Sequence, residues 1–228
     1  MNVDLLLALP VLVLSVVAHE VAHAAAAYRQ GDTTAYMLGR ITLNPLKHID
    51  PFLTVLMPLL LWFGSGGRFI FGAAKPVPVN PRNYRNYRRG DVIVSGAGIA
   101  ANLALAVAAT AGFAVFGAVG GWLDGLAPTL AVLQRMMFWA LWLNLILAFF
   151  NLLPIPPLDG SHLFYHVLPP RAGEWYRGMH RLGFIPLLVL VVVFPKALDV
   201  LLTPAHVCLD LALRSVGGFA LTAEAIPL

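Results

Sequence analysis

A long apolar run that ends in two histidines and a glutamate is the feature that most constrains this chain. Residues 5–18 are apolar apart from one serine, and His19, Glu20 and His23 follow directly. A run of this length predicts a membrane-spanning helix over residues 4–28. Because an ionisable residue inside such a span is costly to bury, Glu20 marks a candidate functional site.

The composition indicates a polytopic membrane protein. Of the 228 residues, 59% are hydrophobic and 11% are charged, whereas a soluble domain carries about 25% charged residues. Further apolar runs predict spans at 92–119 and 130–152, and a shorter run occupies 182–194. The single cysteine, Cys208, excludes an intrachain disulfide and a thiolate metal cage. The basic residues between apolar segments favour lipid headgroups over nucleic acid as a partner.

We therefore predict an all-α polytopic membrane protein, a bundle of about four to six transmembrane or re-entrant helices. A small membrane-associated β element is expected after the first helix, because β-branched and aromatic residues alternate between turn residues within 32–50 and within 69–80. The apolar run 52–63 is too short to cross a membrane. The expected core comprises residues 1–180 and includes an insert at 31–90. C-terminal hydrophobic helices and a tail are expected to follow at 181–228. Residues 205–228 fit a surface helix, a last short span or a partly disordered tail.

The H-E-x-x-H pattern supplies the candidate chemistry. On a helix, His19 and His23 lie one turn apart on one face, so both imidazoles can reach one metal ion. Glu20 is placed beside them to deprotonate a metal-bound water. The alternative is a pair of histidines that simply pack in a helix bundle. His162 and His166 form a rival pair with the same spacing, but they lack a nearby acid on that face.

The charge distribution predicts where a third ligand can come from. Nine of the fifteen Lys and Arg residues lie between Arg29 and Arg89. If the run 52–63 does not cross the membrane, the positive-inside rule places all nine on the cytoplasmic side. The spans then alternate so that Asp159 arrives at the depth and side of the histidine pair.

This topology predicts a catalytic metal site with an open position. His19, His23 and Asp159 would bind one Zn²⁺, and water would take the fourth position. Two histidines and a carboxylate also suit iron, but Glu20 as a neighbouring base favours hydrolysis on zinc.

Two amides inside predicted spans are candidates for a supporting role. Asn102 and Asn151 could donate hydrogen bonds to the oxyanion that develops during hydrolysis, or contact the substrate. The equally weighted alternative is that each makes a hydrogen bond between helices.

Two motifs together resemble the site-2 protease family of intramembrane zinc metalloproteases. Residues 19–23 match its H-E-x-x-H motif, and residues 151–160 match its N-x-x-P-x-P-x-x-D-G signature at every fixed position. Residues 39–45 and 74–80 resemble its short prokaryotic members, which have no PDZ domain. One departure is Ile99, which stands where the family's A-G-P-x-x-N segment has proline.

The resemblance implies cleavage of peptide bonds within the membrane. It implies His19, His23 and Asp159 as ligands of one zinc ion, Glu20 as the base, and a transmembrane protein or peptide as substrate. The expected location is a prokaryotic cell (inner) membrane, with a multi-pass chain and the active site near the cytoplasmic side. The first alternative is a catalytically inactive scaffold of the same fold. A metal transporter is a weaker one, because Glu20 and Asp159 are too few acids for an ion path.

Overall fold

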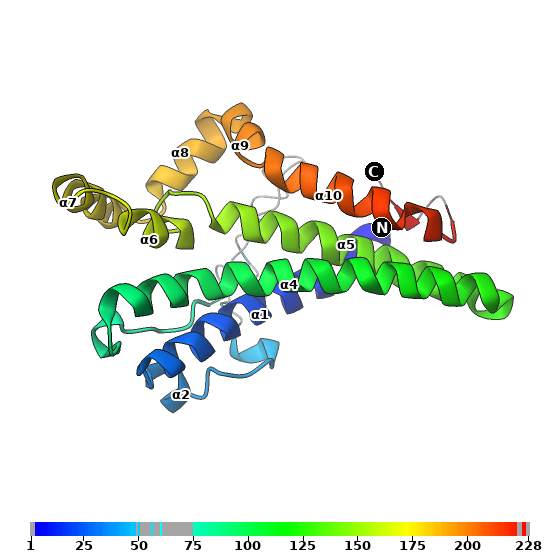
Figure 1. Cartoon of the computed structure of the whole chain (residues 1–228), viewed down its shortest axis with the longest axis horizontal. Coiled ribbons are helices and arrows are strands. Elements are labelled where there is room, and N and C mark those ends of the chain that lie inside the picture. The colour runs from blue at the N-terminus through cyan, green and yellow to red at the C-terminus, as the bar shows by residue number, and fades with distance from the viewer. Residues whose placement is uncertain are drawn as a thin grey trace. The chain divides into compact units, whose positions relative to one another are not determined.

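The protein is built from helices. The structure, a computed structural model, describes residues 3–48, 50, 56, 60, 75–222, 225 and 226. No strand occurs among them, which confirms the all-α class. Three long helices are apolar enough to cross a membrane, in agreement with the three predicted spans: α1 (Val3–Gln30), α4 (Tyr87–Trp122) and α5 (Ala127–Asn151) (Figure 1).

Apolar side chains remain exposed along the long helices. Leu14 on α1 is 58% exposed, Val107 on α4 is 71% exposed and Val132 on α5 is 49% exposed. Soluble proteins rarely expose contiguous apolar surface of this kind, because water penalises it. Together with the lengths of the helices, this surface indicates a multi-pass membrane protein.

The chain divides into two compact units. The larger comprises residues 1–15 and 99–228, and the smaller comprises residues 16–98. The helices α1 and α4 each contribute residues to both.

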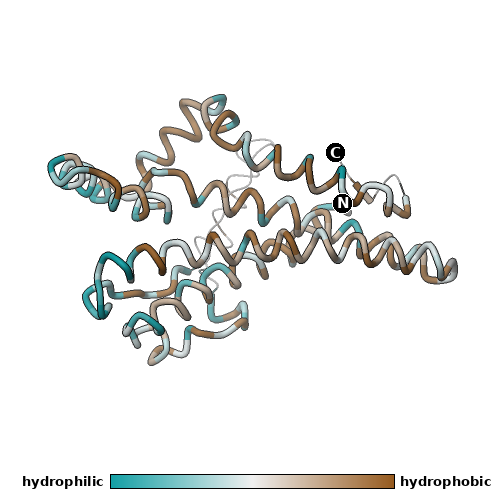
Figure 2. The backbone as a smooth tube through the Cα atoms, viewed as in Figure 1, coloured by the Kyte–Doolittle hydropathy of each residue, from teal (hydrophilic) through white to brown (hydrophobic). Residues whose placement is uncertain are grey.

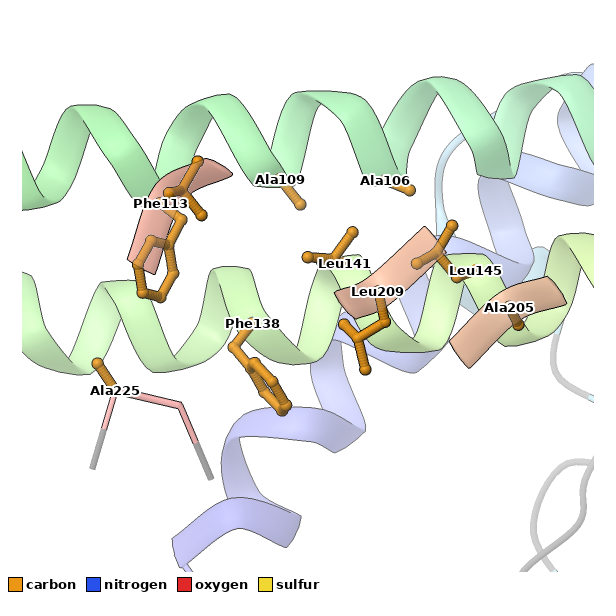
Figure 3. Close-up of a cluster of buried hydrophobic side chains, with 10 residues drawn as sticks. Ala106, Ala109, Phe113, Phe138, Leu141, Leu145, Ala205, Leu209 and Ala225 are labelled. Atoms are coloured by element: carbon orange, nitrogen blue, oxygen red, sulfur yellow. The ribbon is translucent and has the colours of Figure 1, made fainter. Parts of the chain in front are cut away.

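The core of the larger unit lies between α4, α5 and α10 (Thr203–Val216). In Figure 3, Ala106 and Ala109 of α4 point toward α5, which presents larger side chains. Small residues on one helix let the neighbouring helix approach closely, and this is how helices without a hydrophobic driving force associate in lipid. The buried members of this core are Ala106, Ala109, Phe113, Phe138, Leu141, Leu145, Ala205, Leu209, Val216 and Ala225.

Polar side chains of α5 form hydrogen bonds with residues near both chain termini, which belong to the larger unit. Arg135 donates from Nε and Nη2 to the two carboxylate oxygens of Asp4, at 2.7 and 2.9 Å, and Trp139 donates to the same carboxylate. The buried Gln134 donates to the carbonyl of Phe219 at 2.9 Å. The segment after α10 is therefore held against α5. The sequence alone did not distinguish this from a disordered tail.

The remaining helices of the larger unit are short and bent against one another. The chain bends by 79° between α7 (Pro170–Met179), which continues through the 3-10 turn η5 (His180–Leu182), and α8 (Ile185–Val193). It bends by 47° between α9 (Pro195–Leu201) and α10, which continues through the 3-10 turn η6 (Gly217–Phe219). The apolar run 182–194 thus stops at Phe194 and does not continue as one helix; in Figure 2, α8 is hydrophobic and α7 largely hydrophilic. Counting each bent pair as one span raises the candidate spans from three to five. The other short elements of this unit are α6 (Asp159–Tyr165) and the 3-10 turn η4 (Asp124–Leu126).

The described residues do not support the predicted β element. In the smaller unit, residues 32–43 contain the helical turn α2 (Thr34–Met37), followed by Gly39 with φ of +61°. The carboxylate of Asp32 accepts hydrogen bonds from the backbone and hydroxyl of Thr34, which starts the turn and overrides the β propensity of the threonines. Residues 75–80 run as an extended segment (Figure 1) but are not assigned to a strand. Residues 69–74 and most of the run 52–63 lie outside the described residues.

Two 3-10 turns complete the smaller unit, η1 (Pro45–Lys47) and η3 (Pro81–Asn83). Asp32 joins its parts, because its buried carboxylate also accepts hydrogen bonds from the backbone of Asn80 at 2.7 Å and from Asn83 at 2.8 Å. Burial alone would raise the pKa of Asp32, but these hydrogen bonds and those from Thr34 outweigh it and hold the pKa below the ordinary 3.8.

Replacing Asp32 by Asn should destabilise the smaller unit by about 1.5–3 kcal/mol, because hydrogen bonds to a buried charge are lost. A lowered folded-state pKa contributes stability that is present above 3.8 and is lost as the pH falls through the folded value. Thermal melting of wild type and Asp32→Asn in detergent, from pH 6 to pH 3, should therefore show a difference that shrinks toward acid. Asp199→Asn, at an exposed carboxylate, is the control; an equal loss there, or a difference independent of pH, would contradict the assignment.

Candidate metal centre

The two histidines of α1 face each other as the spacing predicts. Their ring centroids are 4.6 Å apart, and the Nε2 atoms of His19 and His23 are separated by 3.0 Å. Two nitrogens bound to one tetrahedral zinc ion lie about 3.3 Å apart. The pair is therefore spaced for a shared metal ion, and the residue types fit zinc.

A backbone carbonyl of α4 orients one of these rings. His23 Nδ1 lies 2.7 Å from the carbonyl oxygen of Val94, so Nδ1 carries the proton and donates it. Nε2 then keeps its lone pair, which is the form that binds a metal. Sequence reasoning missed this contact, because a backbone carbonyl leaves no signature in the residue types.

A glycine of α4 makes room for the histidine pair. A Cβ atom on Gly98 would lie 2.4 Å from Nε2 of His23 and 2.5–2.6 Å from ring atoms of His19. The glycine thus lets the backbone of α4 approach both imidazoles. The family-like segment that contains Ile99 and Asn102 also contains this glycine, so the motif could have revealed it.

The predicted base is held by a backbone amide. Oε2 of Glu20 accepts a hydrogen bond from the N–H of Val77 at 2.7 Å. Val77 belongs to the extended residues 75–80, which come from a distant part of the smaller unit. Within this unit, the structure brings together His19, Glu20 and His23.

Asp159 belongs to the larger unit and is the first residue of α6. The turns before it are compact: a Cβ atom on Gly160 would lie 2.1 Å from the carbonyl oxygen of Leu152, so glycine is required there. The hydroxyl of Tyr176 on α7 donates to the carbonyl of Pro154 at 2.9 Å. The proline-rich motif is therefore a packed turn that fixes the backbone of the aspartate.

The two candidate amides, Asn102 and Asn151, make different kinds of hydrogen bond in the larger unit. Asn102 donates from Nδ2 to Oδ1 of Asn144 at 2.7 Å and lies 3.4 Å from the carbonyl of Ser15, which joins α1, α4 and α5. Asn144 donates in turn to the hydroxyl of Ser15. Asn151 donates to the carbonyl of Leu147 within its own helix. The bonds of Asn102 match the interhelical alternative, and an oxyanion role for either amide stays a prediction.

The rival histidines face separate neighbours. The ring of His162 lies edge-on to His180, with centroids 5.2 Å apart, and that of His166 lies edge-on to Tyr165 at 5.1 Å.

Comparisons with known proteins agree with the motifs. The model of Peptidase family M50 matches residues 119–191, which include the proline-rich motif. The protein named "Putative zinc metalloprotease YwhC" of Bacillus subtilis is 42% identical over 183 residues, which cover 79% of this chain and 78% of that protein. The chain belongs to peptidase family M50. This confirms the resemblance to site-2 proteases.

A second relative is more distant. "Putative zinc metalloprotease Rip2" of Mycolicibacterium smegmatis is 33% identical over 179 residues, which cover 78% of this chain and 64% of that protein. No solved structure matches the chain.

The glycine at 98 gives a direct test of the histidine pair. Gly98→Ala should lower the divalent metal bound per protein, measured by inductively coupled plasma mass spectrometry, because the new methyl group displaces both imidazoles; overpacking of this kind costs about 1–3 kcal/mol. Gly96→Ala on the same helix is the matched control, since a Cβ atom there meets nothing within 4 Å. Equal metal content in the two variants would refute the role of Gly98.

Proposed function

We propose that this member of the M50 family is an intramembrane zinc metalloprotease that hydrolyses peptide bonds of transmembrane substrates. Family membership and the zinc metalloprotease names of its relatives support a zinc-dependent protease. Helices long and apolar enough to cross a membrane support a membrane setting.

The observation that carries the proposal is the arrangement on α1. Two imidazoles present nitrogens 3.0 Å apart, one of them with its tautomer set by a carbonyl, and a carboxylate follows at the next position. All three lie in a helix whose apolar character fits a membrane core. A packing role for the histidines would not explain why His23 is oriented by the carbonyl of Val94, nor why a glutamate stands inside an apolar helix.

We assign the third ligand position to Asp159. The assignment rests on the charge distribution, which favours the same side of the membrane for Asp159 and for the histidine pair, and on the match of residues 151–160 to the family signature. Three protein ligands leave one position for water, as a catalytic zinc site requires. The proposed stoichiometry is one ion per chain.

The chemistry then falls to a few side chains. Bound zinc supplies a Lewis acid that favours ionisation of water and polarises the scissile carbonyl. Glu20 accepts the proton of the attacking water as the new C–O bond forms, and passes it to the amine nitrogen as the C–N bond breaks. An oxyanion-donor role for Asn102 or Asn151 stays a prediction, and for Asn102 it would require release of its hydrogen bonds to Asn144 and Ser15.

The substrate and the location follow from the same setting. A site within a spanning helix meets transmembrane proteins or peptides, and the nine cations between Arg29 and Arg89 favour a cytoplasmic position for the site. We propose a prokaryotic inner membrane as the location.

Substitution of the base separates catalysis from metal binding. Glu20→Gln should keep zinc and lower the cleavage rate of a model transmembrane peptide by about 10²–10⁴-fold, because the proton acceptor is lost. Asp159→Ala should lose both zinc and cleavage, because a ligand is removed. Zinc content and cleavage are measured on the same preparations in detergent or liposomes.

The matched controls are Glu174→Gln and Asp199→Asn, which alter exposed carboxylates and should change neither quantity. Asp159→Ala protein that retains a full zinc content would remove Asp159 from the site. A wild-type protein that holds zinc but cleaves no faster than Glu20→Gln would favour the inactive scaffold.

A further inference from the structure

Residues Lys75–Asn80 form an extended arm that reaches the predicted base. The arm contains prolines at 76 and 78, which carry no N–H group. The N–H of Val77 lies between them and donates to Oε2 of Glu20 at 2.7 Å. The arm therefore offers a single donor at this point, and that donor is spent on the carboxylate.

A buried arginine fixes the first part of the arm. Nη2 of Arg40 donates to the carbonyl of Lys75 at 2.9 Å and lies 3.5 Å from the carbonyl oxygen of Pro76. Arg40 is only 9% exposed. A guanidinium is rarely buried to this extent unless it is paired, so its place against these carbonyls indicates a specific role. The N–H of Lys75 also donates to the carbonyl of His48 at 2.8 Å.

The far end of the arm is fixed by a carboxylate. The N–H of Asn80 donates to Asp32 at 2.7 Å, and the side chain of Asn80 caps the turn η3. Anchors at both ends leave the middle of the arm little freedom to drift from Glu20.

The peptide group between Pro76 and Val77 links the buried cation to the carboxylate. Its carbonyl lies on the side of Arg40, and its N–H donates to Glu20. A peptide that faces a cation through its oxygen is polarised, which strengthens the hydrogen bond made by its N–H. The two charged side chains thus act on one another through a single peptide unit.

We propose that Arg40 and the arm are positioning elements for the general base, an inference that rests on the proposed function of Glu20. The arm binds Oε2 of Glu20 and keeps the carboxylate in one orientation. Oε1 of Glu20 is then the oxygen that accepts the proton. A glutamate side chain has three rotatable bonds, and an unheld carboxylate would spend much of its time in unproductive rotamers. Arg40 does not touch the reacting atoms and acts only through the arm.

A purely structural role for the arm is the competing explanation. The side chain of Val77 packs with Ala24 and Ala35 in a small buried cluster, so the arm also contributes to packing. Packing alone predicts that the arm is indifferent to the carboxylate of Glu20. Positioning predicts that the N–H of Val77 responds to the loss of that carboxylate.

Hydrogen exchange decides this without any measurement of catalysis. Peptides that span the arm report only on its non-proline amides, so one change is readily seen. In purified full-length protein, Glu20→Ala should make one arm amide exchange about tenfold faster or more, because its charged acceptor is gone. Unchanged exchange across the arm would overturn the proposal.

Kinetics test the effect on the base. Arg40→Met should lower kcat for the model transmembrane peptide by about 10- to 100-fold, as loss of outer-sphere partners does at metal sites. Zinc content and KM should stay at wild-type values, since neither ligands nor substrate contacts change. Arg40→Lys should restore part of kcat, because it keeps the charge but donates as a point charge. Arg82→Met removes an exposed arginine of the same unit and should behave as wild type.

The outcomes are distinguishable. An unchanged kcat in Arg40→Met, or a fall that parallels zinc loss and is not rescued by Arg40→Lys, would overturn the positioning role. Should Arg40→Met fail to fold, Arg40→Lys and the exchange of Glu20→Ala still decide. A wild-type protein without Glu20-dependent cleavage would instead defeat the proposed function, and the role for Arg40 with it.

Discussion

The cost of placing ionisable groups in an apolar helix governs this structure. Polar groups in such a helix have few alternative partners, so hydrogen bonds from the protein stabilise the carboxylate and the imidazoles. Glu20 receives the N–H of Val77, and His23 gives its Nδ1 proton to the carbonyl of Val94. Both partners are backbone groups, which deliver a hydrogen bond without adding a further charge.

The same requirement organises the larger unit. Ser15, Asn102 and Asn144 satisfy one another across three helices, where a lone amide would be expensive. Alanines on α4 complete the arrangement, because close packing in lipid depends on small residues. Polar side chains inside the bundle thus fix which helices meet, and apolar ones fill the space between them.

The sequence failed where local turn chemistry opposed residue propensity. Threonines between turn residues suggested strands, yet Asp32 binds Thr34 and starts a helical turn. The same carboxylate then receives the N–H of Asn80, 48 residues away. A residue that serves both a local turn and a distant contact cannot be read from a window of neighbouring residues.

The sequence by itself determined the apolar spans, the family and the shared face of His19 and His23, because these follow from hydropathy, motif and helix period, all of which are local. Only the tertiary structure decided which groups orient them. Val94 lies 71 residues from His23, and Val77 lies 57 residues from Glu20. Val94 contributes a backbone carbonyl, which every residue has, and Val77 contributes a backbone N–H, which every residue except proline has. The residue types therefore do not predict either contact.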